Sequence, residues 1–267
     1  MKSLRELADL RGRVAIVTGG AGHIGSALCD ALAELGAAIA VLDLEQKSTS
    51  EVAQRIQEDF KVEAIGLPTD LSDEKAVRSV SSKVIDRFGR LDILVNCAAL
   101  VGTSDLKGWV APFAEQSSEA WRKAFEINLT APFLLTQSCA QALADSGHGS
   151  VINVGSIYGL LGPDMSLYEG TEMGNPAAYA ASKGGLLQFT RWLSTVLAPE
   201  VRVNAVSCGG VWRDQPESFT SRYVARTPLR RMAAEEDLKG AVAYLASDLS
   251  AYVTGQNLVV DGGWTAW

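Results

Sequence analysis

Short β-branched apolar runs alternate with amphipathic stretches along the whole chain. Such runs are typical of buried strands, and they predict seven: Val14–Thr18, Ala38–Asp43, Glu63–Leu67, Ile93–Asn96, Ser150–Val154, Val201–Ala205 and Leu258–Val260. Between them, apolar residues recur at helical spacing and predict six helices: Ser26–Leu35, Thr49–Phe60, Glu74–Phe88, Ser118–Leu143, Ala177–Val196 and Glu235–Leu245. This alternation predicts an α/β fold, with a doubly wound, mostly parallel seven-stranded sheet and helices on both faces.

No linker, repeat or low-complexity segment interrupts the alternation, so residues 1–267 are expected to form a single domain. Three segments are irregular, 100–116, 159–175 and 209–228, and each follows a predicted strand. Because open α/β sheets bind ligands beyond the carboxyl ends of their strands, 159–175 and 209–228 are predicted to be substrate loops. A solvated loop is an equally good interpretation of 159–175.

Composition excludes several classes of function. The chain is 47 % hydrophobic and 21 % charged with a net charge of −7, which argues against a nucleic-acid or anionic-membrane surface. The N-terminal residues carry charges throughout, and no apolar run approaches the length that spans a bilayer. The four cysteines are scattered and the two histidines cannot complete a metal set with them. A reduced, cytoplasmic, metal-free protein is therefore expected.

The segment TGGAGHIG, Thr18 to Gly25, follows the first predicted strand and leads into the first predicted helix. Gly20, Gly22 and Gly25 fit G-x-G-x-x-G, in which glycines permit a tight turn and let a pyrophosphate approach backbone N–H groups. Asp43 arrives 18 positions after Gly25, at the end of the second strand. A carboxylate there accepts hydrogen bonds from ribose hydroxyls and repels a 2′-phosphate, so the pattern favours NAD over NADP. The other interpretation of Asp43 is a solvated strand end.

Further motifs follow in order: Asp70 in PTDLS, NCAA at 96–99, Asn128 in FEINLTAPF, Ser156 in INVGS, Tyr179-x-x-x-Lys183 and VDGG at 260–263. With TGGAGHIG they resemble the short-chain dehydrogenase/reductase family in its compact single-domain form, from residue 13 to 263. The resemblance implies a Rossmann fold that binds NAD. It implies cofactor contacts at Gly19, Gly22, His23, Ile24, Gly25, Asp43, Leu44, Asp70, Leu71, Asn96, Ala98, Tyr179, Lys183, Gly209 and Val211.

The chain departs from the family pattern at several places. Its glycines fit T-G-x-x-G-x-x-G, the spacing of the longer, extended relatives, whereas the compact form would have glycine at His23. NCAA replaces the usual N-N-A-G, and SCGG replaces the Pro-Gly after the sixth strand. Arg213 stands where the family often has a threonine that contacts the carboxamide. The contacts on the nicotinamide side are therefore the least well supported by the resemblance.

Tyr179 and Lys183 are four positions apart, so in a helix both side chains leave the same face. By itself this spacing also fits an ordinary surface pair. A phenol has a pKa near 10, and lowering it to about 7 requires about 4 kcal/mol. An ammonium about 5 Å away supplies about 3 kcal/mol at an effective dielectric constant of about 20. The positive ring of an oxidised nicotinamide can supply the remainder, so with a cofactor bound Tyr179 is predicted to be the acid/base.

The resemblance implies a catalytic quartet of Asn128, Ser156, Tyr179 and Lys183. In it Ser156 hydrogen-bonds the substrate oxygen, Lys183 also holds the ribose hydroxyls, and Asn128 anchors a water that relays protons. A polar residue at a helix kink near Pro132 is a compatible interpretation of Asn128. Ser156 lies 23 residues before Tyr179, more than is usual, and Ser166 competes for its role. We prefer Ser156, because it directly follows its strand.

Candidate substrate contacts are Tyr158, Tyr168 and Arg213. The tyrosines offer faces for a sugar or a cation. Arg213 begins an arginine-rich stretch that continues with Arg222, Arg226, Arg230 and Arg231 and suggests a phosphate or carboxylate on the substrate. A solvated face or a pyrophosphate contact are the alternatives. The stretches GSIYG, EGTEMGNPAAYAASKGG, RTPLRRM and VDGGWTAW resemble a subgroup associated with surface-sugar and flagellin-sugar biosynthesis, which implies a sugar hydroxyl, including that of an amino or phosphorylated sugar.

The predicted function is NAD-dependent interconversion of a secondary alcohol and a ketone. Alternatives are reduction of 3-oxoacyl or small ketone substrates, and a non-catalytic NAD-binding scaffold or redox sensor. A sugar dehydratase or epimerase of the extended type is disfavoured, because only about 60 residues follow the sixth strand.

The resemblance implies a homotetramer, with a homodimer as alternative, in which Trp264 and Trp267 are buried at a contact or within their own subunit. The expected partner is a small-molecule substrate, with no nucleic acid and no membrane.

Overall fold

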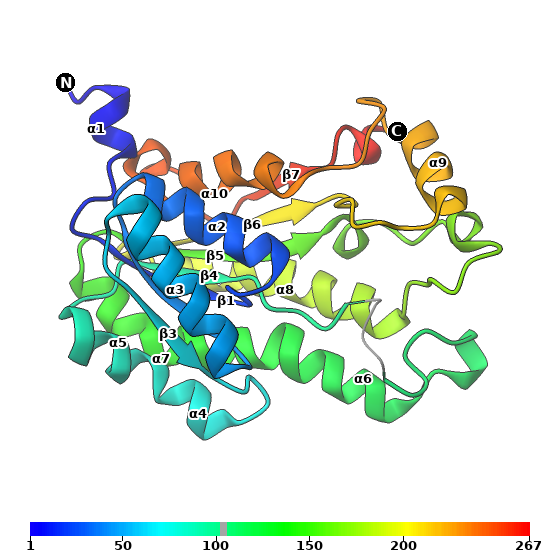
Figure 1. Cartoon of the computed structure of the whole chain (residues 1–267), viewed down its shortest axis with the longest axis horizontal. Helices are drawn as coiled ribbons and strands as arrows, with labels where there is room; N and C mark the ends of the chain where they lie inside the picture. Colours follow the sequence, from blue (N-terminus) through cyan, green and yellow to red (C-terminus); the bar gives the residue numbers. More distant parts are fainter. Residues whose placement is uncertain (102–105) are drawn as a thin grey trace.

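Seven parallel strands form one sheet in the order β3-β2-β1-β4-β5-β6-β7 (Figure 1). The computed structural model describes residues 1–101 and 106–267, so residues 102–105 of the predicted irregular segment 100–116 lie outside the described residues. The strands are β1 (Val14–Thr18), β2 (Ala38–Asp43), β3 (Ala64–Pro68), β4 (Ile93–Asn96), β5 (Gly149–Ser156), β6 (Val201–Cys208) and β7 (Asn257–Val260). The predicted doubly wound α/β fold is confirmed.

Helices cover both faces of the sheet. They are α1 (Leu4–Ala8), α2 (His23–Glu34), α3 (Gln46–Phe60), α4 (Glu74–Arg78), α5 (Val80–Phe88), α6 (Ser118–Phe125), α7 (Ala131–Asp145), α8 (Ala177–Val196), α9 (Glu217–Arg226) and α10 (Lys239–Ala246). Within the described part of the chain, no helix is both long and apolar enough to cross a membrane.

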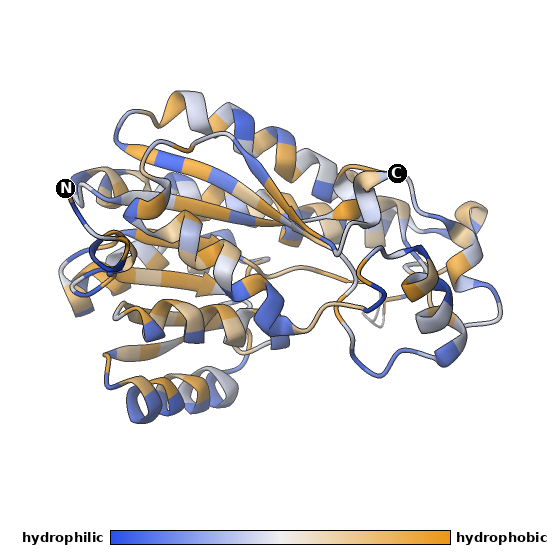
Figure 2. Ribbon diagram, turned by 90° about the horizontal axis from the view of Figure 1, so that it is seen from above, coloured by the Kyte–Doolittle hydropathy of each residue, from blue (hydrophilic) through white to orange (hydrophobic). Residues whose placement is uncertain are grey.

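Two apolar clusters hold these layers together. One packs α2, α3 and α10 on the sheet through Leu28, Ile56 and Val242, and the other packs α5 and α7 on the opposite face through Val84 and Leu135. The strands are mainly hydrophobic in colour, whereas hydrophilic positions gather on the outer faces of the helices (Figure 2). Burial of each such aliphatic side chain stabilises the fold by about 1.5–3 kcal/mol.

Two predicted helices are interrupted. The stretch predicted as one helix over 74–88 is α4 and α5, which meet at Ser79. The stretch predicted over 118–143 contains a π-helical turn, Glu126–Thr130, between α6 and α7. Pro132 follows two residues after this turn and has no backbone N–H, so the carbonyl of Asn128, four residues earlier, lacks its usual donor, and the wider turn accommodates that. Asn128 lies inside this turn.

The segment 209–228 was expected to be irregular, and that expectation is wrong for α9. Pro216 precedes α9 and favours a helix start, while Phe219 and Tyr223, one turn apart, pack into a third apolar cluster. That cluster also contains Leu167 and Tyr168 of the segment 159–175. The two predicted substrate loops therefore pack on each other at the carboxyl ends of the strands.

Candidate active site

Two adjoining clefts lie at the carboxyl ends of the strands. The first, here called the Gly-loop cleft, has a volume of about 530 Å³. It contains ten of the residues predicted to contact a cofactor: Gly19, Gly22, His23, Ile24, Gly25, Asp43, Leu44, Asp70, Leu71 and Ala98. Thr69, Ser72 and Lys123 also line it. No motif in the sequence marked Lys123, which is the sixth residue of α6, a helix with ordinary amphipathic spacing.

The glycines of the first loop fit a bound dinucleotide. Gly19 has φ +65°, and a Cβ atom there would lie 2.9 Å from the Cα atom of Ala98. A Cβ atom on Gly25 would lie 2.0 Å from the carbonyl oxygen of Gly19, so only glycine lets α2 pack so closely on the loop. Gly22 precedes α2 without a side-chain cap, which leaves the first N–H groups of α2 open to an anion.

Asp43 is oriented by the backbone. Its Oδ2 atom accepts a hydrogen bond of 3.1 Å from the N–H of Ala21, and its Oδ1 atom accepts one of 2.8 Å from the N–H of Leu44. The carboxylate thereby joins the glycine loop to the end of β2 and lines the cleft. This geometry favours a ribose contact over a freely solvated strand end.

Asn96 does not line either cleft, unlike its neighbours Cys97 and Ala98. Its side chain is 3 % exposed and donates a hydrogen bond of 2.8 Å to Oδ1 of Asn153, whose amide donates in turn to Thr190. The side chain of Asn96 is therefore turned away from the clefts, and the predicted cofactor contact at Asn96 stays a prediction. Its amide nitrogen also lies 3.5 Å from the hydroxyl of Thr136 on α7, so the side chain faces the side of the sheet that α7 covers.

The second cleft, here called the tyrosine cleft, has a volume of about 630 Å³ and is lined by Ser156, Tyr179 and Lys183. Gly209 and Val211, the remaining predicted cofactor contacts, also line it. Ser156 ends β5, while Tyr179 and Lys183 lie on successive turns of α8. Two strand ends and one helix thus bring together residues that are far apart in the sequence.

In the chain without a cofactor, the pKa of Tyr179 is higher than the value expected with a cofactor bound. Burial raises the pKa of Tyr179 to about 12, although a hydrogen bond with Ser156 acts to lower that pKa. The Nζ atom of Lys183 lies 5.9 Å from the centre of the Tyr179 ring and donates a hydrogen bond of 2.6 Å to the carbonyl oxygen of Val154. Burial lowers the pKa of Lys183. In the chain alone, therefore, the spacing of the pair does not lower the pKa of the phenol.

Asn128 is fully buried and its amide is already engaged. The Oδ1 atom accepts a hydrogen bond of 2.7 Å from the N–H of Leu100, and the Nδ2 atom donates to the carbonyl of Leu100 and to the hydroxyl of Ser182. Ser182 in turn donates to the carbonyl of Tyr179. The side chain of Asn128 therefore connects the segment after β4 to α8, and its predicted role in a proton relay stays a prediction.

Of the two candidate serines, the geometry favours Ser156 over Ser166. Ser166 donates its hydroxyl hydrogen to Asp164 at 2.7 Å and does not line the tyrosine cleft, whereas Ser156 lines it beside Tyr179.

Tyr158 and Tyr168 both line the tyrosine cleft, and their hydroxyl oxygens are 2.9 Å apart. Burial raises the pKa of Tyr158 above its usual range. The ring of Tyr168 packs 5.4 Å from that of Phe219 on α9. The segment 159–175 is thus a wall of the cleft, which favours the substrate-loop interpretation over a solvated loop.

The arginines after β6 have different partners. Arg222 donates to the carbonyl oxygens of Ser166, Leu167 and Glu169, and Arg226 forms an ion pair with Asp164. Arg230 and Arg231 are held by Ala225 and Asp237. Arg222 and Arg226 thus hold the segment 159–175, whereas Arg230 and Arg231 have partners outside it. Arg213 alone among the five lines the clefts.

Asn175 and two cysteines, Cys97 and Cys208, line the tyrosine cleft and were not among the predicted site residues. Asn175 lies just before α8, and its Oδ1 atom is buried with no hydrogen-bond partner in the described structure. A lone asparagine before a helix carries no sequence signal that distinguishes it from a turn residue.

The fold and the two clefts define a nicotinamide-dependent oxidoreductase of the Rossmann type. A family model described as "Enoyl-(Acyl carrier protein) reductase" matches residues 19–265. The chain is 35 % identical to cis-4-hydroxycyclohexanecarboxylate dehydrogenase of Sinomonas cyclohexanicum, over 95 % of this chain and 97 % of that one. The chain belongs to the short-chain dehydrogenase/reductase family.

Two further comparisons agree with this assignment. Post-translational flagellin modification protein A of Campylobacter coli is 28 % identical, over 96 % of this chain and 99 % of the relative. A solved gluconate 5-dehydrogenase of Burkholderia cenocepacia J2315, in complex with NADP and tartrate, has a TM-score of 0.87 at 28 % identity and covers 99 % of this chain and 100 % of its own. The predicted family resemblance, including the similarity to a flagellin-modification protein, is confirmed.

Proposed function

We propose that the chain interconverts a secondary alcohol and a ketone with NAD, using Tyr179 as the acid/base. The observation that carries this proposal is the meeting of Ser156, Tyr179 and Lys183 in a cleft that shares residues with the Gly-loop cleft. When bound, the nicotinamide ring accepts or donates the hydride. The residues of the Gly-loop cleft would hold the rest of the cofactor, with Asp43 beside the adenosine ribose.

The choice of NAD rests on charge. Asp43 is fixed by two backbone N–H groups, so its carboxylate cannot easily turn away from a 2′-phosphate. Lys47, the nearest basic residue in the sequence, is 86 % exposed at its side chain and lies 3.8 Å from Glu51. A solved relative holds NADP. The proposed preference for NAD therefore rests on Asp43 of this chain and not on the family.

The chain's own residues handle the proton. Below pH 10 the phenol of Tyr179 is protonated in the chain alone, because its pKa is raised to about 12, so it can donate a proton to a ketone oxygen during reduction. Oxidation of the alcohol requires the phenolate, which the Lys183 ammonium and the charge of an oxidised cofactor would favour. The hydroxyl of Ser156 would donate to the substrate oxygen.

For the substrate we propose a sugar or a related polyhydroxy compound, including amino or phosphorylated sugars. Two tyrosine hydroxyls and the amide of Asn175 line the tyrosine cleft and suit neighbouring hydroxyl groups. A 3-oxoacyl or small ketone substrate remains the alternative. One relative acts on a hydroxylated cyclohexane ring, which has similar dimensions to a sugar ring.

The test is an assay of the purified protein with NAD and NADP against simple and phosphorylated sugars, nucleotide sugars, cyclic hydroxy acids and 3-oxoacyl thioesters. Turnover of acyl substrates alone would reject the sugar proposal. Tyr179→Phe should lose at least about 100-fold in kcat, whereas Tyr252→Phe, at a fully exposed position, should not. If Tyr179→Phe kept its activity, a non-catalytic role would be the better interpretation.

We also infer a homotetramer, in a cytoplasmic location, with all four cysteines free. Phe133 on α7 and Trp192 on α8 are 40 % and 55 % exposed, so two adjacent helices present aromatic side chains to solvent. Trp264 is 7 % exposed and stacks on Tyr223 within the chain, whereas Trp267 is 76 % exposed and available for a contact. Sedimentation velocity distinguishes a tetramer from the alternative dimer.

A further inference from the structure

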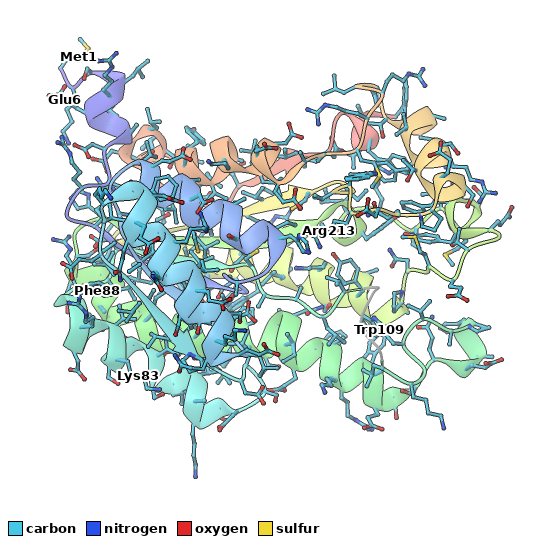
Figure 3. The ribbon with its side chains drawn as sticks, in the orientation of Figure 1. Met1, Glu6, Lys83, Phe88, Trp109 and Arg213 are labelled. Atoms are coloured by element: carbon cyan, nitrogen blue, oxygen red, sulfur yellow. The ribbon has the colours of Figure 1, made fainter. Side chains whose placement is uncertain are left out.

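The two clefts share six lining residues: His23, Ile24, Cys97, Ala99, Val101 and Arg213. Of these six, only His23 and Arg213 can carry positive charge. His23 is the first residue of α2, and Arg213 follows β6, so the two come from different elements that meet at the junction. Arg213 lies at the carboxyl end of the sheet, near the start of α2 (Figure 3).

A dinucleotide that reaches from Asp43 to Tyr179 must cross this junction. Its pyrophosphate is the middle of the molecule and carries its negative charge. Since the N-terminus of α2 has no side-chain cap, backbone N–H groups face the same place. A guanidinium there adds a full positive charge and a planar fork of donors that suits phosphate oxygens.

In the structure Arg213 is paired with an acid. The Nε atom of Arg213 lies 3.6 Å from Oε1 of Glu235, and Nδ1 of His23 lies 4.0 Å from the same oxygen. Their side chains are partly exposed, 35 % for Arg213 and 29 % for Glu235. Asp237, on the same turn as Glu235, is paired with Arg231 instead. Glu235 is therefore placed to hold Arg213 when no other anion is present.

We propose that Arg213 clamps the pyrophosphate of the bound dinucleotide, and that Glu235 competes with the pyrophosphate as the counter-ion of Arg213. This inference rests on the proposed NAD-dependent function and gives Arg213 a cofactor role in place of the substrate role expected from the sequence. It has two opposite consequences. Loss of the Arg213 charge weakens dinucleotide binding, whereas loss of the Glu235 charge frees Arg213 and strengthens it.

The test is isothermal titration of the full chain with NADH and with ADP-ribose, which has the pyrophosphate but no nicotinamide ring. For Arg213→Gln we expect both dissociation constants to rise about 10-fold and by similar factors, with a weaker dependence on salt. Arg213→Lys, which keeps the charge but not the fork, should lose less. For Glu235→Gln we expect both constants to fall about 3-fold. Circular dichroism checks that each variant is folded.

Two exposed residues that line neither cleft provide matched controls: Arg230→Gln and Glu236→Gln make the same charge changes and should leave both constants unchanged. A loss for NADH but not for ADP-ribose would assign Arg213 to the nicotinamide ring, and a rise in the substrate KM alone would assign it to the substrate; either result overturns the inference. Weaker binding by Glu235→Gln would overturn the competition. If the unaltered protein bound neither ligand, the proposed function itself would fail, which is a separate outcome.

Discussion

The Nζ atom of Lys183 donates a hydrogen bond of 2.6 Å to the carbonyl oxygen of Val154. Val154 lies two residues before Ser156, so β5 positions both the serine and the ammonium group. Lys183 is 2 % exposed, and this bond keeps its charge beneath the ring of Tyr179. The chain alone therefore orients Lys183. The pKa of the Tyr179 phenol, in contrast, is expected to change when a cofactor binds.

The first prediction concerns that response. The Tyr179 phenol has a pKa of about 12 in the chain alone. Positive charge favours the phenolate, so binding of NAD⁺ should lower the pKa of Tyr179 toward neutrality, while binding of NADH should lower it less. Ultraviolet titration of phenolate, as the difference between the unaltered protein and Tyr179→Phe, measures this pKa with and without NAD⁺. A titration that NAD⁺ leaves unchanged would contradict the proposed role of the cofactor charge.

The second prediction concerns cofactor choice. Asp43→Ser removes the carboxylate that would face a 2′-phosphate, and so should lower the ratio of kcat/KM for NAD to that for NADP by about 10-fold to 100-fold, equivalent to about 1.4–2.7 kcal/mol. Asp70→Asn is the matched control, because it removes one charge from the same cleft at a side chain that is held by Ser72. If the control changed the ratio as much as Asp43→Ser, general charge rather than position would decide the preference.

Sequence patterns located the sheet because buried parallel strands require apolar runs, and all seven runs are strands in the structure. The glycine loop and the Tyr179–Lys183 pair could be located for a similar reason, since each depends on local spacing. The structure adds what local spacing cannot contain. Asn96 and Cys97 are neighbours in the sequence, yet only Cys97 lines the clefts, because the end of a strand turns successive side chains to opposite sides.

The arginine-rich stretch shows the same limit. A run of arginines carries no information about which carbonyl or carboxylate each one meets, and the partners of Arg222 and Arg226 lie more than 50 residues earlier in the chain. Helix α9 was missed because its two buried residues, Phe219 and Tyr223, stand among polar ones, so the apolar pattern is short. Both features depend on the packing of 159–175 against 209–228, which is a long-range contact.

The third prediction follows from that packing. Arg222→Gln removes the guanidinium that binds three carbonyl oxygens of the segment 159–175, and glutamine is too short to replace it. The substrate KM should rise about 10-fold and the free energy of unfolding should fall by about 1–2 kcal/mol, while the dissociation constant of NADH stays unchanged. Steady-state kinetics, denaturant titration and NADH binding measure these. Arg191→Gln, at an exposed site on α8, is the control. Weaker NADH binding would show that the segment also supports the Gly-loop cleft.

The last prediction uses a buried acceptor. The Oδ1 atom of Asn175 has no hydrogen-bond partner among residues 1–101 and 106–267, and such an atom costs about 1–3 kcal/mol in the folded state. Asn175→Ala should therefore leave the free energy of unfolding unchanged or raise it, which is unusual for a partly buried polar residue. If the amide binds a substrate hydroxyl, the same variant should raise the substrate KM about 10-fold.

Asn257 on β7 provides the matched control for Asn175. Its Oδ1 atom is also buried without a partner in the described residues, but it lines neither cleft. Asn257→Ala should resemble Asn175→Ala in denaturant titration and leave KM unchanged. Because both variants should respond alike in stability but only Asn175→Ala should raise KM, the pair separates a binding role from a structural one. A marked loss of stability in Asn175→Ala, or an unchanged KM, would remove Asn175 from the substrate site.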